Sequence, residues 1–454
     1  MPESLFSPLW HRYSQQRPRL HPHVTVQPQC HRGQSWYLLI NETSGKHYRI
    51  NDIAYQLIGR CDGRHSVQEI WDSLLETLGD DAPTQDEAIR LLTEIDQRDL
   101  LRYESMPDIP GVFRRKRENA VQQRLAFINP FAFRLPLWDP SWLLDRTGWL
   151  RKLIFNPAAL ALWAIIVAAA ILAAAAHWDE LRRHASNHMT TPHYLFLAWV
   201  SFPFIKALHE LGHGLAVRHW DGQVREMGIA FFVLMPAPYV DASASSAFRR
   251  RSQRIIVSAM GMMVELLLAA FALAIWFSTQ RGLVHDLAFV AMFVCGVSSL
   301  LFNGNPLLRF DAYHMLCDAF DLPNLAARSR MYWANLTKCL VLGPGNIAPM
   351  APASGERKWL IAYAPLSVAY ALFIVGHIVA WLGTKSVAIA LLAALFALAS
   401  MIVKPLFATF GSIVSAAAAG PSRRRAKGVI ASALLLSFVL LGVVPVPFNT
   451  TAQG

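Results

Sequence analysis

Charged residues are scarce in this chain of 454 residues. They make up 16% of the sequence, whereas hydrophobic residues make up 54% and the mean hydropathy is +0.30. A soluble protein of this length carries charge on about a quarter of its residues. The deficit argues against a wholly soluble protein. It predicts a mainly α-helical, polytopic membrane protein that includes a small soluble part.

Two further absences and the placement of the basic residues narrow the class of protein. The five cysteines form no CxxC pair, so no disulfide framework is implied. The N-terminal stretch MPESLFSPLWHRYSQQRPRLHPH holds no apolar run of signal-peptide length, and we expect it to remain uncleaved in the cytosol. The net charge of +11 comes with basic residues at the edges of apolar segments, which is typical of membrane topology. We therefore expect a lipid bilayer, and no nucleic acid, as the partner of the basic residues.

Residues 1–110 alternate polar and apolar stretches, as in a small globular domain. The β-prone runs SWYLLIN and HYRIN, separated by the turn-like ETSGK, predict a hairpin. Helices are expected from about residue 51 to 61, over SVQEIWDSLLETLG and over TQDEAIRLLTEIDQRD, because their apolar residues recur at helical spacing. LLRYE predicts a closing strand. These elements together predict an α+β, winged-helix-like domain.

Apolar runs long enough to cross a bilayer, for which about 20 residues suffice, begin after a basic linker at 111–152. They define a membrane domain at 153–447, followed by a short periplasmic tail at 448–454. Loops rich in Lys and Arg alternate with loops poor in them, so the positive-inside rule predicts a cytosolic N-terminus and a periplasmic C-terminus. The seven predicted spans lie near 153–177, 194–218, 254–278, 286–307, 359–382, 386–410 and 428–447.

Polar residues interrupt the second predicted span at KALHELGHGLAVRHW, residues 206–220. Residues four apart on an α-helix lie about 6 Å apart on one face, so His209 and His213 can bind one zinc ion and leave a position open for water. Glu210, next to the first histidine, can accept a proton from that water. Two imidazoles and a carboxylate without partners would be penalised inside a membrane, which argues against a chance match.

A third protein ligand is needed, and three side chains compete for this role. His219 nearly completes a three-histidine pattern, but on a continuous helix it lies about 15 Å from His209. Glu265 is an acid within the third predicted span and could instead hold a zinc-binding histidine by a hydrogen bond. Asp311 follows Pro306, which we expect to break the helix and turn Asp311 toward a cavity. The two motifs then lie at a similar depth near the cytosolic face.

The sequence HELGH, followed about a hundred residues later by NPLLRFD, resembles the site-2 protease family of intramembrane zinc metallopeptidases. The resemblance implies that His209, His213 and Asp311 bind Zn²⁺ and that Glu210 is the general base. It implies that Asn305 binds substrate or stabilises the oxyanion. The chain departs from the family pattern NPxPxLDG at two positions, which are Leu308 and Ala312 here. Alanine would be strained if the turn required a positive φ.

The N-terminal domain, with CDGRHSVQEI between two predicted helices, resembles the PqqD-like domain, a peptide-recognition element. This resemblance implies that it holds an extended peptide along the hairpin edge. The alternative is a winged helix used only for packing or oligomerisation. The whole arrangement is similar to a branch linked to peptide maturation and export, in which a periplasmic adaptor of the membrane-fusion type often follows. Here the sequence ends at VPVPFNTTAQG, where such an adaptor would begin, so we expect it to be absent or the chain to be truncated.

We therefore predict a zinc-dependent endopeptidase of the bacterial inner membrane that acts on a membrane-associated or modified peptide, or on a membrane protein. The alternative is a zinc-containing transport or export component without proteolytic activity. One further segment, MPAPYVD at 235–241, is interrupted by prolines. It is interpreted as a re-entrant loop, a substrate-docking edge or a plain connection.

Overall fold

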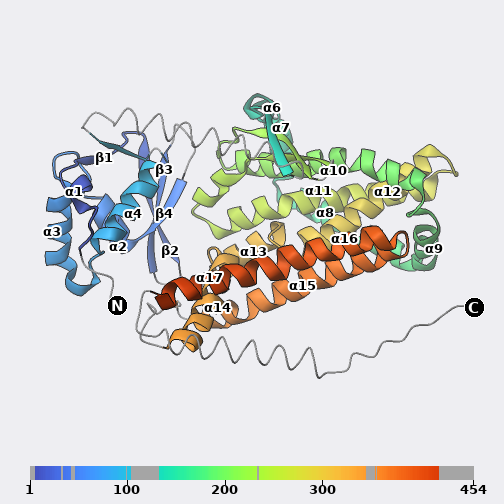
Figure 1. Cartoon of the computed structure of the whole chain (residues 1–454). Coiled ribbons are helices and arrows are strands. Elements are labelled where there is room, and N and C mark those ends of the chain that lie inside the picture. The colour runs from blue at the N-terminus through green and yellow to red at the C-terminus, as the bar shows by residue number, and fades with distance from the viewer. Residues whose placement is uncertain are drawn as a thin grey trace, which may run out of the picture. The chain divides into compact units, whose positions relative to one another are not determined.

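The computed structural model describes residues 6–31, 34–41, 47–98, 100–103, 132–232, 235–343, 353 and 355–418 (Figure 1). The described residues are mostly helical, and strands are confined to short sheets. The chain divides into two compact units, Ser4–Pro323 and Asn324–Gly454, the latter together with Met1–Glu3. Each unit is described by itself.

The N-terminal region of the first unit contains the predicted hairpin. Strands β3 (Gln34–Asn41) and β4 (His47–Asn51) pair antiparallel, which confirms it. A further strand, β2 (Val24–His31), extends the sheet in the order β2-β3-β4. This strand was not predicted, because Pro28 interrupts its pattern; an edge strand tolerates a proline since one side needs no ladder bonds. The predicted closing strand is β5 (Leu101–Tyr103), which pairs with β1 (Pro18–Leu20).

The three predicted helices of this region are α2 (Asp52–Ile58), α3 (Val67–Leu78) and α4 (Gln85–Asp96), preceded by the short α1 (Trp10–Tyr13). Two of them begin with a capping box, formed by Ser66 with Glu69 in α3 and by Thr84 with Glu87 in α4. The reciprocal bonds satisfy backbone N–H groups at each helix start. The hydrophobic core of this region is formed by fully buried side chains, among them Leu39, Ile58, Leu74, Leu92 and Ile95.

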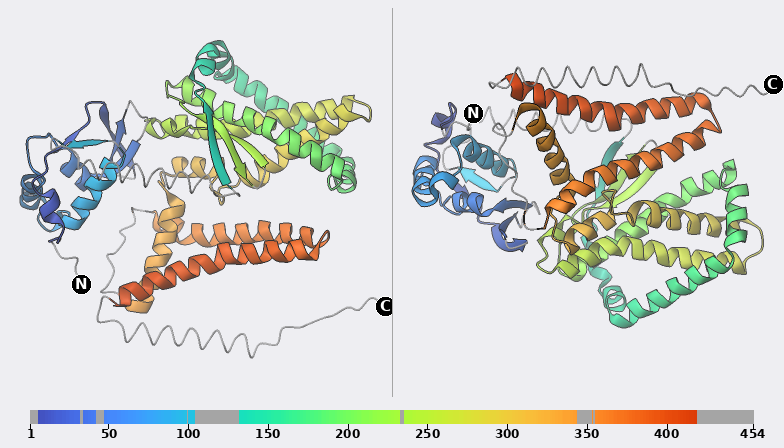
Figure 2. Two further views of the ribbon diagram at one scale, coloured as in Figure 1. Left: turned by 45° about the horizontal axis from the view of Figure 1, so that its top comes forward. Right: turned by 90° about the horizontal axis from the view of Figure 1, so that it is seen from below.

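The rest of the first unit is a bundle of long helices with one small sheet (Figure 2). Trp163 of α8 donates its indole N–H to the carbonyl of Met263 on α11, which ties these two helices together. Asn156 caps α8 and Pro157 occupies its first turn, where no N–H is needed. The helices are α6 (Ser141–Arg146), α7 (Gly148–Ile154), α8 (Pro157–Ala176), α9 (Trp178–His188), α10 (Pro192–His219), α11 (Arg251–Ser278), α12 (Leu283–Val297), the π-helical turn η3 (Ser298–Asn303) and α13 (Asp311–Ala319).

Strands β6 (Ala132–Trp138), β7 (Met227–Phe232) and β8 (Met235–Val240) form the sheet in that order. The MPAPYVD segment is therefore a strand at the edge of this sheet, and its prolines do not break it. Proline has no N–H, so Pro236 and Pro238 occupy strand positions that face away from β7. The positions between them point their N–H groups toward β7, and Asp241, which follows this pattern just after the strand, donates its N–H to the carbonyl of Glu226.

The second unit contains α14 (Leu325–Leu342), α15 (Arg357–Gly383), α16 (Val387–Leu398), a π-helical turn η5 (Ala399–Val403) and α17 (Lys404–Ala418). In both views of Figure 2, α15 runs back along α16 as an antiparallel pair. Arg328 of α14 forms an ion pair with Glu356, whose side chain is buried, and the Ser329 hydroxyl donates to the carbonyl of Leu360. The helices α13 and α14 thus lie between the fourth and fifth predicted spans.

Six described helices are long and apolar enough to span a membrane. They agree with the first six predicted spans, although the fourth ends at Asn303 rather than 307. The seventh predicted span, near 428–447, lies outside the described residues. The six spans are Pro157–Ala176, Pro192–His219, Arg251–Ser278, Leu283–Asn303, Arg357–Gly383 and Val387–Thr409.

Candidate metal centre

The two histidines of the HELGH motif lie one turn apart on α10 and point their Nε2 atoms at the same place. These atoms are 3.1 Å apart, and the His209 and His213 side chains are buried. The planes of the two rings are nearly perpendicular, at 78°. This angle allows both Nε2 atoms to approach one point, as two ligands of a single ion must.

The other ring nitrogen of each histidine faces an acceptor on α11. His213 Nδ1 lies 2.6 Å from the carbonyl oxygen of Val257, and His209 Nδ1 lies 3.0 Å from Oε1 of Glu265. An acceptor beside Nδ1 favours the tautomer that carries its proton there, which leaves the lone pair on Nε2. Glu265, which was expected to hold one of the two histidines, therefore lies beside His209.

Asp311 joins the two histidines from a distant part of the chain. The helix ends after the π-helical turn, Pro306 follows, and Asp311 is the first residue of α13. Its carboxylate oxygens lie 3.2 Å from His209 Nε2 and 3.4 Å from His213 Nε2. One ligand atom from each of the three residues falls within 4.8 Å of the others.

The charge of Asp311 suits a cation. Burial by itself raises the pKa of the Asp311 carboxyl, but the rings of His209 and His213, when they are protonated and donate from Nε2 in place of binding an ion, outweigh burial and hold this pKa below its usual range. The group is therefore a carboxylate at neutral pH.

Three observations test whether these residues fit a zinc ion. Two imidazole nitrogens and one carboxylate form a donor set that zinc uses in open, three-ligand sites. Asp311 Oδ2 is buried and, among the described residues, has no hydrogen bond of favourable geometry. A Cβ atom at Gly261 would overlap Nε2 of both histidines, so glycine keeps the space in front of them clear. The residues fit the ion.

Glu210 is held beside this group by the sheet. Its Oε2 accepts a hydrogen bond of 3.0 Å from the backbone N–H of Val240, at the end of the edge strand β8. Because one carboxylate oxygen is held in this way, the other is left to accept a proton. Asn305 has a local contact: its Oδ1 accepts from Leu307 N at 2.9 Å and shapes the turn that precedes Asp311. This bond leaves the Asn305 amide NH₂ available as a donor.

The two departures from the family pattern do not strain the backbone. Ala312 lies in the first turn of α13, which is helical, and the described non-glycine residues with positive φ are Asp221, Asp321 and Asn324. No glycine is therefore required at position 312. Leu308 lies in the turn before α13, and its N–H bonds to the carbonyl of Asn305.

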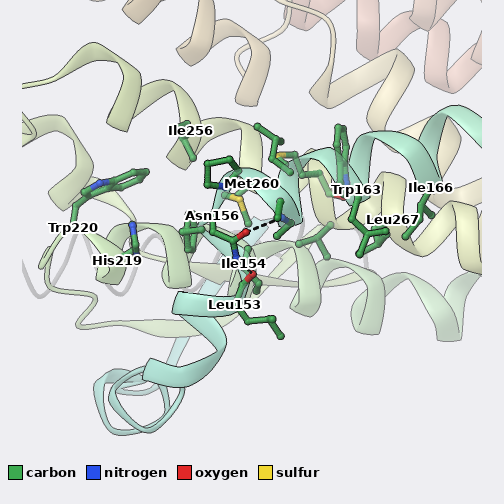
Figure 3. A pocket seen from close by; sticks show the side chains of 18 of the residues that line it. Leu153, Ile154, Asn156, Trp163, Ile166, His219, Trp220, Ile256, Met260 and Leu267 are labelled. Carbon is green, nitrogen blue, oxygen red and sulfur yellow. Dashed lines mark hydrogen bonds between the residues drawn. The ribbon is translucent and has the colours of Figure 1, made fainter.

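His219 belongs to a different environment. Its ring stacks on Phe155 at 4.3 Å, and it lines a cavity of about 920 Å³ together with Trp220, Met260 and Trp163 (Figure 3). None of the three clustered residues lines this cavity. Of the three candidates for the third ligand, Asp311 is thus the one whose carboxylate meets both Nε2 atoms. Its role as a ligand stays a prediction.

Several residues around this group were not predicted from the sequence. Lys206 lies three residues before His209, and its Nζ is 2.6 Å from Glu265 Oε1. A charged residue within an apolar span was the signal that could have identified it. Gly261 and Val240 carried no such signal, since their roles depend on the packing of α11 and the sheet against α10.

Two family models match this chain. Residues 37–101 match the family model described as Coenzyme PQQ synthesis protein D (PqqD). Neither the curated proteins nor the solved structures contain a match to this chain. Residues 197–444, more than half of the chain, match the model described as Peptidase family M50, the site-2 protease family of membrane metalloproteases. The chain belongs to peptidase family M50.

Proposed function

We propose that this protein hydrolyses a peptide bond at the site formed by His209, His213, Asp311 and Glu210. The observation that carries the proposal is the convergence of two imidazole Nε2 atoms and a carboxylate, with a second carboxylate on the same helical turn. His209, His213 and Asp311 would hold Zn²⁺. When bound there, zinc polarises the scissile carbonyl and makes a water molecule more acidic.

The remaining steps belong to side chains of this chain. Glu210 accepts the proton of the attacking water and passes it to the leaving amine, while the Val240 N–H keeps the carboxylate in place. The free amide of Asn305 donates to the oxygen that gains negative charge. Both residues act near the ends of spans, which under the predicted topology is the cytosolic face of a bacterial inner membrane.

The proposal is tested by replacing Glu210 with glutamine in the full-length protein. Glu210→Gln keeps the shape of the side chain but cannot accept the proton, so cleavage should fall by at least about 100-fold. Zinc content should stay the same. Glu180→Gln, on the exposed face of α9, serves as the matched control. Cleavage by Glu210→Gln at the rate of the control would show that the site does not hydrolyse peptides in this way.

Strand β8 is the proposed docking edge for the substrate. It is the last strand of its sheet, and its end contacts Glu210 through Val240. An extended peptide added to this edge would pass beside the general base. The finding at Ala312 also removes one reason for the alternative of a transport component without proteolytic activity.

The N-terminal domain is proposed to deliver a membrane-associated or modified peptide to this site, as part of peptide maturation and export. The match to PqqD over residues 37–101 supports this role. Deleting residues 1–110 should slow cleavage of the natural peptide by about tenfold or more, if the domain contributes binding energy of the order of 1.4 kcal/mol. Cleavage of a generic unstructured peptide serves as the control. Equal losses for the two substrates would indicate that the domain only stabilises the protein.

A further inference from the structure

Glu265 lies at the centre of a polar network inside the helical bundle. Its side chain is fully buried on α11, where an acid without partners would be strongly disfavoured. The carboxylate contacts Lys206 Nζ at 2.6 Å, Ser299 Oγ at 2.6 Å, His209 Nδ1 at 3.0 Å, Ser298 Oγ at 3.3 Å and Asn303 Nδ2 at 3.4 Å.

Two of these contacts come from α10, the helix that carries the histidine pair. Lys206 and His209 are neighbours on one face of this helix, since they are three residues apart. Both reach Oε1 of the same carboxylate. Lys206 balances the charge of Glu265, and its Nζ also donates to Ser298 Oγ at 2.7 Å. The lysine is therefore used within the network rather than exposed to lipid.

The other contacts come from the π-helical turn at the end of α12. Short π-helical turns inside α-helices are frequent at functional sites. Here the turn brings Ser298, Ser299 and Asn303 to one carboxylate. The chain then continues directly into the segment 304–310 that leads to Asp311. The same carboxylate thus contacts the helix of the first two ligands and the element that leads to the third.

We infer that Glu265 is a positioning residue for the metal centre, holding the His209 imidazole and the π-helical turn in the arrangement that brings Nε2 and Asp311 together. The inference rests on the proposed zinc site. His209 Nδ1 lies 3.0 Å from Glu265 Oε1, close enough for the carboxylate to orient the ring, and His209 Nε2 lies 3.2 Å from Asp311 Oδ2. Loss of such an outer partner typically weakens metal binding by about 10- to 100-fold.

The test measures the binding of Co²⁺ to the metal-free full-length protein, with its dissociation constant and its visible spectrum as readouts. Removing Glu265 alone would leave Lys206 buried without its partner, which is itself destabilising. The variant is therefore the double substitution Lys206→Met with Glu265→Leu, which removes both charges. We expect its Kd for Co²⁺ to rise by about 10- to 100-fold and its spectrum to change. Glu265→Gln should lose less, because its amide oxygen can still lie beside His209 Nδ1.

A second buried ion pair provides the matched control. Glu356 is also buried, and it pairs with Arg328 in the other unit. The double substitution Arg328→Met with Glu356→Leu should lower the thermal midpoint of the metal-free protein but leave the Kd for Co²⁺ and the spectrum unchanged. Should Lys206→Met with Glu265→Leu fail to fold, the comparison passes to Glu265→Gln against Glu356→Gln, and we then expect a smaller rise in the Kd for Co²⁺ that is confined to Glu265→Gln.

The outcomes separate this inference from the proposed function. If the wild-type protein binds no Co²⁺, the metal site and the inference fall together. If the wild type binds Co²⁺ and the Glu265 variants bind it with the same Kd and spectrum, the positioning role is wrong and the zinc site stands. A loss confined to the Glu265 variants supports the inference.

Discussion

Two pairs of histidines four residues apart occur in this protein, and they differ in the angle between their rings. His184 and His188 on α9 stack nearly parallel, with an interplanar angle of 9° and ring centroids 4.4 Å apart. His209 and His213 on α10 stand at 78° with centroids 4.8 Å apart. The lone pairs of imidazole lie in the ring plane, so two rings stacked face to face cannot direct them to one ion between them, whereas the perpendicular rings here can.

The acidic partners of the two pairs differ in the same way. Near the first pair, the Tyr194 hydroxyl contacts His184 Nε2 at 2.9 Å and donates to Asp286 at 2.6 Å, so donors and acceptors are matched pairwise. Near the second pair, Asp311 approaches both Nε2 atoms at once. The comparison teaches that convergence of lone-pair atoms, and not the number of histidines and acids, distinguishes a candidate metal site from a hydrogen-bonded cluster.

The largest loss of zinc is expected from removing Asp311, whose carboxylate meets both Nε2 atoms. Asp311→Ala removes the third ligand and should reduce zinc from about one ion per chain to nearly none, because two imidazoles alone hold zinc weakly. Asp286→Ala should leave zinc in place although it also removes an acid beside histidines, and so should His219→Ala. The measurement is zinc per mole of purified protein. Retention of zinc by Asp311→Ala, with loss in either control, would show that Asp311 is not the third ligand.

A second variant blocks the space between the two rings without removing a ligand. Gly261→Ala places a methyl group against Nε2 of both His209 and His213, so zinc affinity should fall by at least about tenfold through misplaced ligands. Gly296→Ala on α12 is the matched control, since a Cβ atom there meets no described atom within 4 Å. Competition with a chelator measures both. Equal affinities would mean that the approach of α11 does not limit the site.

The smallest effect is expected at the hydrogen-bonded cluster. Tyr194→Phe removes the hydroxyl between His184 and Asp286 and should lower the free energy of unfolding by about 1 kcal/mol. Zinc content and cleavage should not change. Denaturant unfolding in detergent measures the free energy of unfolding, metal analysis measures the zinc content, and a peptide-cleavage assay measures the activity. A loss of zinc in Tyr194→Phe would show that the two regions are coupled.

Local patterns were enough to predict much of this molecule. The spacing of His209 and His213, the break at Pro306 and the apolar spacing of the N-terminal helices are each set by residues a few positions apart. The same holds for the β-prone runs and the turn that predicted the hairpin. The six described spans follow from apolar length alone. The family could be assigned from two motifs, HELGH and NPLLRFD, because both can be recognised in a single sequence.

Long-range pairing could not be predicted in the same way. Strands β6 and β7 pair although they are separated by about ninety residues, and neither alternates clearly enough to reveal its partner. The prolines of β8 made that segment resemble a broken loop, because a local pattern does not say which side of a strand needs its N–H groups. Glu265 stood out as an acid in a span, yet its serine and asparagine partners became visible only when α12 was placed beside it.

If a substrate docks along the edge strand β8 as proposed, this strand limits what kind of peptide backbone can lie there. At its outward positions Pro236 and Pro238 offer carbonyl oxygens and no N–H, so this stretch accepts hydrogen bonds but donates none. A bound chain must then supply the donors itself. A peptide with proline or an N-methylated residue opposite these carbonyls would lose hydrogen bonds, whereas one with ordinary amides there would keep them. The protein would thus select among peptides by their backbone chemistry before any side chain is read.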